Sequence, residues 1–151
     1  MIPESKYILN ETVIRDLSLN DDVLVTKKST IRWLALSLGL INPNESRKQV
    51  FDLLETLIDF HYDSVAPTTS QILEKMDIDP SSSNRHKAIY YHLSRLQSSG
   101  LINRKKGKYY FSSEIDDFRP LDLILKELYL KRIDAIFSKI STASKKISKG
   151  V

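Results

Sequence analysis

Positive charge is concentrated in one stretch of this chain. Residues 81–113 contain seven lysines and arginines and no aspartate or glutamate, although acidic residues are common elsewhere. Because the whole chain has a net charge of +4 and this stretch has seven positive charges, the rest of the chain is negative overall. Clustered lysine and arginine recognise phosphate groups, so this stretch predicts a polyanionic partner.

Other chemistry has little support in the residue types and their spacing. The three histidines, His61, His86 and His92, are far apart and the chain has no cysteine, so we expect no metal site. The sequence contains no nucleophile motif, no phosphate-binding glycine loop and no paired-carboxylate pattern. Asp116 and Asp117 are typical of a turn that precedes a helix. These features predict a protein that needs no cofactor and is not an enzyme.

Helix signals precede the basic stretch, beginning with a weakly patterned N-terminal part. Residues 12–17 predict a short helix and residues 21–26 a short strand. Ser29 or Thr30 can then cap a helix of about residues 30–39, which ends at a glycine.

A second helix is predicted up to about residue 62. Asn42 and Glu45 have the spacing of a capping box, and the apolar residues after them recur at helical intervals. This stripe consists of Val50, Leu53, Leu54, Leu57 and Ile58. Thr68 and Gln71 form a second capping box, which starts a short third helix.

The basic stretch itself divides into a helix and a hairpin. Ile89, Leu93 and Leu96 have the spacing of one buried helical face between residues 84 and 98. The opposite face has no acid and holds Asn84, Lys87, Tyr91, Ser94 and Arg95, with Arg85 beside it. Gly100 can end this helix. Residues 101–112 predict a hairpin with Lys106 and Gly107 at its turn, where positive φ is needed.

Plainer interpretations of these residues stay open. A basic helix face can simply be solvated. Tyr90, Tyr91, Tyr109 and Tyr110 can form a stacking platform for single strands. We expect instead that Tyr109 or Tyr110 packs on the helix while its neighbour is exposed, and that His92 is a half-buried packing residue.

The order helix, helix, turn, helix, hairpin resembles the winged helix-turn-helix of prokaryotic transcriptional regulators. The residues that carry this resemblance are Pro67-Thr68-Thr69, Ile72, Leu73, Ala88-Ile89, His92-Leu93, Arg95-Leu96 and Gly100-Leu101-Ile102. The resemblance covers about residues 45–113, and the lead into it resembles that of small archaeal winged-helix proteins. The turn at residues 77–84 is longer than is usual in the family.

This resemblance implies sequence-specific binding of double-stranded DNA and transcription regulation. The helix at residues 84–98 would read the major groove, where arginine pairs with guanine and lysine more often contacts phosphate. The hairpin would contact the flanking backbone or the minor groove, and the start of the third helix a phosphate. The predicted DNA-binding residues are Thr69, Ser70, Asn84, Arg85, Lys87, Tyr91, Ser94, Arg95, Arg104, Lys105, Lys106 and Lys108.

A long helix is predicted after the hairpin. Pro120 suits a helix start, and no proline or glycine follows until Gly150. An apolar stripe lies beyond the part that the winged module needs, and we expect it at a homodimer interface. Its residues are Leu130, Ile133, Phe137 and Ile140. The alternative is that this stripe covers the N-terminal helices of the same chain. The basic tail at residues 141–150 is expected to fray.

Together these features predict a mainly α-helical protein with a small β-hairpin wing. The expected domains are an N-terminal extension at residues 1–44, a winged helix-turn-helix at residues 45–113 and a C-terminal helix at residues 114–151. The absence of cysteine agrees with an intracellular protein, and the absence of a long apolar run predicts one that does not enter a membrane. Together with the resemblance, this implies a cytoplasmic, nucleoid-associated protein. No particular small-molecule effector is indicated. The alternative function is a winged-helix protein–protein interaction module, an adaptor in a transcription or chromosome-associated assembly.

Overall fold

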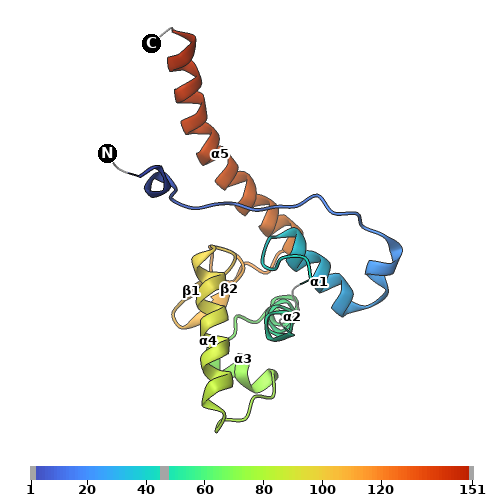
Figure 1. Ribbon diagram of the computed structural model, residues 1–151. Coiled ribbons are helices and arrows are strands. Elements are labelled where there is room, and N and C mark those ends of the chain that lie inside the picture. Colours follow the sequence, from blue (N-terminus) through green and yellow to red (C-terminus); the bar gives the residue numbers. More distant parts are fainter. Residues whose placement is uncertain (1–2, 45–47, 150–151) are drawn as a thin grey trace. The chain divides into compact units, whose positions relative to one another are not determined.

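The computed structural model describes residues 3–44 and 48–149. Within them the chain is mainly helical, as the sequence predicted (Figure 1). It has five α-helices, of which the C-terminal one is long, and one small antiparallel hairpin. The chain packs as two units, Met1–Thr56 and Leu57–Val151, whose division lies inside the second helix. The domain boundaries expected at residues 44 and 113 stay a prediction.

The first unit begins with residues that form no long helix or strand. Two short 3₁₀ turns span Glu4–Tyr7 and Asp21–Val25. The strand predicted at residues 21–26 and the helix predicted at residues 12–17 are therefore wrong. For residues 12–17 the reason is tertiary, because Arg15 donates hydrogen bonds of 2.8 Å to two backbone carbonyl groups far along the chain. For residues 21–26 it is local, because the hydroxyl groups of Ser29 and Thr30 donate to the Val23 carbonyl oxygen.

Helix α1 spans Lys27–Ser37 and begins three residues before the predicted position. Its cap is Thr26 rather than Ser29 or Thr30, since the Thr26 hydroxyl accepts a hydrogen bond of 3.0 Å from the Ser29 N–H. Beyond the helix, Gly39 has a φ of +71°, which ends α1 at the predicted residue.

The end of α1 is also where Arg15 binds. Its guanidinium donates to the carbonyl oxygens of Leu36 and Ile41 and, at 3.0 Å, to the side-chain oxygen of Asn42. The last carbonyl groups of a helix have no partner within it, so a guanidinium is a suitable cap. The irregular N-terminal segment is thus anchored to α1.

Helix α2 spans Lys48–Tyr62 and ends where the sequence predicted. Four of the five predicted stripe residues are buried, and Ile58 is half-buried. The predicted capping box lies partly outside the described residues, because Glu45 is not among them. His61, on the last turn of α2, is buried as well.

Helices α3 and α4 confirm the local signals that predicted them. Helix α3, Thr69–Lys75, has the predicted capping box, with Thr68 and Gln71 bonded to each other through both side chains. Helix α4, Ser83–Ser98, begins one residue before the predicted position and buries the three expected apolar residues. His92 is also buried, more deeply than expected, and Gly100 has the left-handed φ of +79° that a helix-ending glycine needs.

Strands β1, Asn103–Lys105, and β2, Lys108–Tyr110, form the predicted hairpin. Its two-residue turn is Lys106 and Gly107, and Gly107 has the positive φ that the sequence predicted; Lys106 has a positive φ as well. The second edge of β2 is occupied too, because the Tyr109 N–H donates to the Pro67 carbonyl oxygen at 2.9 Å and Lys108 pairs with Thr68. The hairpin is thereby joined to the start of α3.

Tyr109 and Tyr110 are both buried, so the expectation that one of them is exposed was wrong. The two side chains lie on opposite faces of β2, and each face is covered: the Arg104 guanidinium lies 5.5 Å from the Tyr109 ring, and the Phe118 ring lies 6.2 Å from the Tyr110 ring. The alternation of a half-exposed strand does not apply to a strand packed on both sides.

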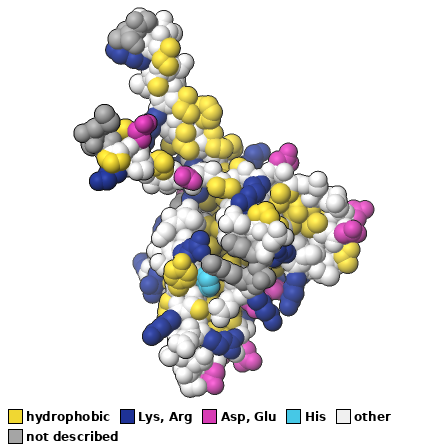
Figure 2. Space-filling model, in the orientation of Figure 1, with side chains coloured by type: hydrophobic (Ala, Val, Ile, Leu, Met, Phe, Trp, Pro, Cys, Tyr) yellow, Lys and Arg dark blue, Asp and Glu magenta, His cyan; other side chains and the backbone are white. Residues whose placement is uncertain are grey.

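Helix α5 spans Leu121–Ser148, a length of 28 residues, and Pro120 is its N-cap residue. Its first half buries Leu121, Ile124 and Tyr129. Its second half extends away from α4 and the hairpin, and hydrophobic side chains lie along it (Figures 1 and 2). The helix continues through most of the basic tail. Among the described residues, no helix is both long and apolar enough to cross a membrane.

Candidate nucleic-acid interface

The outer face of α4 carries most of the predicted helix residues. Successive residues turn by about 100° around a helix, so Asn84, Lys87, Tyr91, Ser94 and Arg95 share one side. All five are exposed, whereas the residues of the opposite side are buried. The apolar side fixes α4 on its unit, and the polar side is left for a ligand.

Arg85 is separated from that group. It is exposed, but helical geometry places it on the flank of α4 next to the buried positions of His92 and Leu96. The carboxyl group of Asp79, in the loop before α4, lies near it. Hydrogen bonds from the Ser81 backbone and hydroxyl lower the pKa of Asp79, and the charges of His86 and Arg85 lower it further. An acid that is just outside the acid-free stretch therefore faces this arginine.

Arg95 is held by its neighbour Tyr91. The centre of its guanidinium lies 5.8 Å from the centroid of the Tyr91 ring, within the range of a cation–π contact. Tyr91 is 58% exposed, so both side chains are accessible while they support each other. This pair presents a planar donor group beside an aromatic face.

The hairpin presents three of its four cations to solvent. Arg104, Lys106 and Lys108 are exposed, and the Arg104 guanidinium lies 5.5 Å from the ring of its cross-strand partner Tyr109. Lys105 is different: it is half-buried and its ammonium donates to the Ser113 carbonyl oxygen. This difference between Lys105 and the other cations was not visible in the sequence, because it depends on the chain beyond β2.

The start of α3 lies beside the hairpin. Lys108 pairs with Thr68, the cap of α3, so the exposed end of β2 is close to Thr69 and Ser70. Thr69 is half-buried and Ser70 is exposed. The structure therefore brings together two predicted parts of the interface that are about 40 residues apart in sequence.

No cation of α4 or the hairpin forms an ion pair with an acidic side chain in the chain that the structure describes, although the Asp79 carboxylate lies near Arg85. The ion pairs found there join Lys27 to Glu55, and Arg119 to Asp117 and Glu127. None of the predicted DNA-binding lysines and arginines takes part in them. Their charge is therefore offered to solvent rather than neutralised within the protein.

The stripe expected at a dimer interface lies on the second half of α5. Leu130, Phe137 and Ile140 are 50%, 58% and 49% exposed, and Ile133 is half-buried. Ile136, which the sequence interpretation left out, is 42% exposed beside them. Its position one residue before Phe137 is the signal that widens the stripe.

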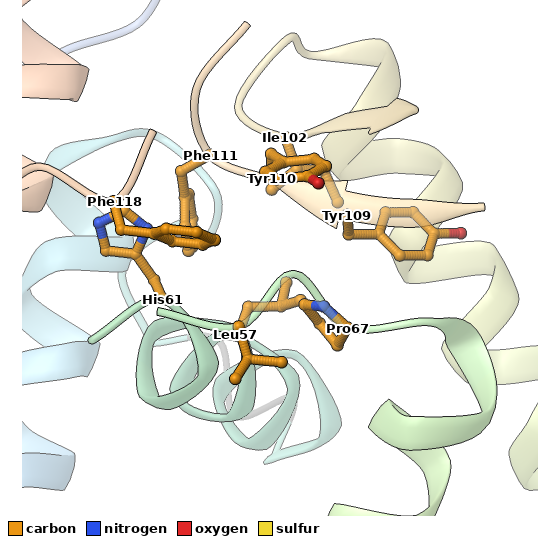
Figure 3. A pocket seen from close by; sticks show the side chains of 9 residues that line it. Leu57, His61, Pro67, Ile102, Tyr109, Tyr110, Phe111 and Phe118 are labelled. Carbon is orange, nitrogen blue, oxygen red and sulfur yellow. The ribbon is translucent and has the colours of Figure 1, made fainter. Parts of the chain in front are cut away.

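The aromatic core beneath the hairpin leaves no room for a ligand. His61 packs edge-on against Phe111 and lies near Phe118, whose ring is 6.2 Å from that of Tyr110 (Figure 3). Its Nε2 atom is 2.7 Å from the Arg119 carbonyl oxygen. The cavity that these residues line has a volume of about 10 Å³, enough for one water molecule. No cluster of three or more His, Asp or Glu side chains able to hold a metal occurs in the described residues.

Comparison with known proteins adds no family to this description. No protein-family model matches the chain, and neither a curated protein nor a solved structure matches it.

Proposed function

We propose that this protein binds double-stranded DNA in a sequence-specific manner, as a winged helix-turn-helix transcriptional regulator. The arrangement that supports this fold is the order α2, α3, α4, β1, β2, with the Pro67–Thr68 segment paired to β2. In such a fold the third of these helices, here α4, enters the major groove, and the hairpin lies against the neighbouring DNA backbone.

One observation carries the proposal. The exposed side of α4 and the turn of the hairpin hold cations that have no acidic partner in the described chain, on elements that share one packed unit. Exposed charge of one sign raises the local concentration of a polyanion and speeds its association. A row of phosphates is the polyanion whose spacing suits a helix with an adjacent hairpin.

Each group then has a definite role. Arg95, which Tyr91 holds in place, pairs with a base edge in the major groove. Lys87 and the exposed hairpin cations bind phosphates and set the position of α4. Two copies, joined through the apolar stripe of α5, read two half-sites.

The direct experiment is a titration with DNA. A duplex enriched from a random library by the protein is compared with a duplex of unrelated sequence at several salt concentrations. We expect tighter binding of the enriched duplex and a steep loss of affinity with salt, since each phosphate contact adds about 0.9 to the log–log slope. Failure to enrich any sequence, together with salt-independent binding, would refute the proposal.

A protein-interaction module is the second candidate, favoured by the exposed apolar residues of α5. In that case the basic face serves an acidic protein, and DNA binding requires a partner. The same titration with the isolated protein distinguishes the two, because an adaptor enriches no duplex on its own.

A further inference from the structure

We propose that the first unit binds an α-amino acid with an apolar side chain in a pocket between α1 and the start of α2. The pocket has a volume of about 340 Å³, which lies within the range of roughly 300–1,000 Å³ found for small-ligand sites. It is separate from the basic face of α4 and from the cavity near His61, whose lining residues all belong to the other unit.

The wall of the pocket is apolar. Ile31 on α1 is buried and Phe51 on α2 is half-buried, and both line the space. An apolar side chain of about the size of leucine or phenylalanine would remove these surfaces from water on binding. Burial of that kind supplies affinity without direction, at about 25 cal/mol per Å² of apolar surface.

Two charged groups would fix the orientation of a ligand in the pocket. Arg32 is half-buried with the centre of its guanidinium 5.1 Å from the Phe51 ring centroid, and it donates no hydrogen bond within the described residues. The Asp52 carboxylate also lines the pocket and accepts no hydrogen bond there. Glu55, by contrast, already has the ammonium of Lys27 at 3.7 Å.

A ligand that fills this space must pair both groups, because a charge that loses water without gaining a partner opposes binding. A simple carboxylate would pair Arg32 and leave Asp52, and a simple amine would do the reverse. An α-amino acid carries a carboxylate for Arg32 and an ammonium for Asp52, and its side chain reaches the wall formed by Ile31 and Phe51. Lys28 and Lys48 at the rim are exposed, and water solvates them.

The test uses the full chain without DNA, so its outcome is independent of the proposed function. The protein is titrated with L-leucine, with 4-methylpentanoate, which lacks the ammonium, and with 3-methylbutan-1-amine, which lacks the carboxylate. Binding is followed by the methyl resonances of Ile31 and by calorimetry. We expect saturable binding of L-leucine and at least tenfold weaker binding of the other two, since each loses a hydrogen-bonded charge pair.

Variants locate the site. Arg32→Gln and Asp52→Asn should each weaken L-leucine binding at least tenfold, whereas Lys6→Gln, at an exposed lysine of the same unit that does not line the pocket, should change it by less than about threefold. Circular dichroism and the remaining methyl resonances establish that each variant is folded. The proposal is overturned if no probe shifts Ile31 up to millimolar concentration, if 4-methylpentanoate binds as tightly as L-leucine, or if both charge variants bind normally.

Discussion

The guanidinium of Arg132 on α5 donates a hydrogen bond to the carbonyl oxygen of Ser99, the residue that caps the C-terminus of α4. The next residue, Gly100, has a φ of +79°, and a β-carbon there would collide with the same guanidinium. The end of α4 is therefore fixed by the helix that carries the apolar stripe.

Gly100→Ala should destabilise the protein by roughly 1.5–3.5 kcal/mol. A side chain in the left-handed region costs about 1–2 kcal/mol, and displacement of Arg132 removes a hydrogen bond of about 0.5–1.5 kcal/mol. The free energy of unfolding, measured by chemical denaturation, checks this value.

Gly107→Ala is the matched control for that substitution. Its φ is +76°, but an added β-carbon meets nothing within 4 Å, so only the backbone cost of about 1–2 kcal/mol applies. In an Arg132→Ala background, Gly100→Ala should cost no more than this control does. Equal losses for Gly100→Ala and Gly107→Ala in the otherwise unchanged protein would contradict the role of Arg132.

Acid should weaken the connection between the hairpin and α5. The Asp117 carboxylate accepts hydrogen bonds of 2.8 Å from Arg119 and of 2.6 Å from the buried hydroxyl of Ser112. These bonds, with that of Arg119 the larger cause, hold the pKa of Asp117 well below its usual value of 3.8. Because the pKa is lower in the folded state, the carboxylate stabilises the fold above about pH 4 and this stability is lost as the pH falls further.

Thermal melts between pH 7 and pH 3 measure this effect. Asp117→Asn should lower the melting temperature at pH 7. On acidification, the melting temperature of this variant should fall by less than that of the unchanged protein. Asp116→Asn serves as the control, since Asp116 is exposed and its φ of +61° is one that asparagine tolerates. Parallel pH curves for the unchanged protein and Asp117→Asn would show that the network contributes nothing.

Lys108 and Lys105 should differ in their effect on DNA binding, although they face each other across the turn. Lys108→Ala should weaken binding to all duplexes similarly and reduce the log–log salt slope by about 0.9. Lys105→Ala should leave the slope unchanged, because that ammonium is bound to the Ser113 carbonyl oxygen. The measurement is a set of anisotropy titrations, and identical slopes for both variants would place the phosphate contact elsewhere.

Arg95→Ala should act on sequence preference instead. If Arg95 pairs with a base, its loss costs about 1–3 kcal/mol on the enriched duplex and little on an unrelated one. The thermal midpoint should hardly change, since Arg95 is exposed and outside the buried side of α4. Gln97→Ala, exposed on a different side of the same helix, is the control. Equal weakening of binding to both duplexes would show that Arg95 contacts a phosphate rather than a base.

Local signals predicted much of this fold because their physics is local. The capping box of Thr68 and Gln71, the helix end at Gly100 and the turn at Lys106–Gly107 each depend on residues within a few positions. For the same reason the acid-free side of α4 was visible in the sequence alone. These elements have the predicted bounds to within one residue at α4 and in the turn.

Contacts between residues far apart in sequence were not predictable in this way. The bond from Tyr109 to Pro67 covers the second edge of β2, and Phe118, from beyond the hairpin, packs near the buried Tyr110 ring. The ammonium of Lys105 donates to the Ser113 carbonyl oxygen, beyond the hairpin. Each outcome depends on which segments meet after folding, and single-sequence periodicity does not contain that information.

The last prediction concerns the apolar stripe of α5. Leu130, Phe137 and Ile140 are each about half exposed, and full burial of such a side chain contributes about 1.5–3 kcal/mol before the cost of association. A second copy of the same helix offers the same stripe, which is the self-complementary surface that a twofold dimer requires. We therefore expect a homodimer at micromolar concentration, measured by sedimentation velocity.

Phe137→Asp should convert this dimer to a monomer, because it places a charge in the middle of the stripe, where burial without a partner is unfavourable. Lys139→Asp is the matched control: it introduces the same side chain two residues later, on the other side of α5, and should leave the dimer intact. The monomeric variant should still bind a single half-site, but with a lower affinity for the paired sites. A Phe137→Asp protein that remains dimeric would show that the interface lies elsewhere, and an unchanged protein that sediments as a monomer would contradict the dimer itself.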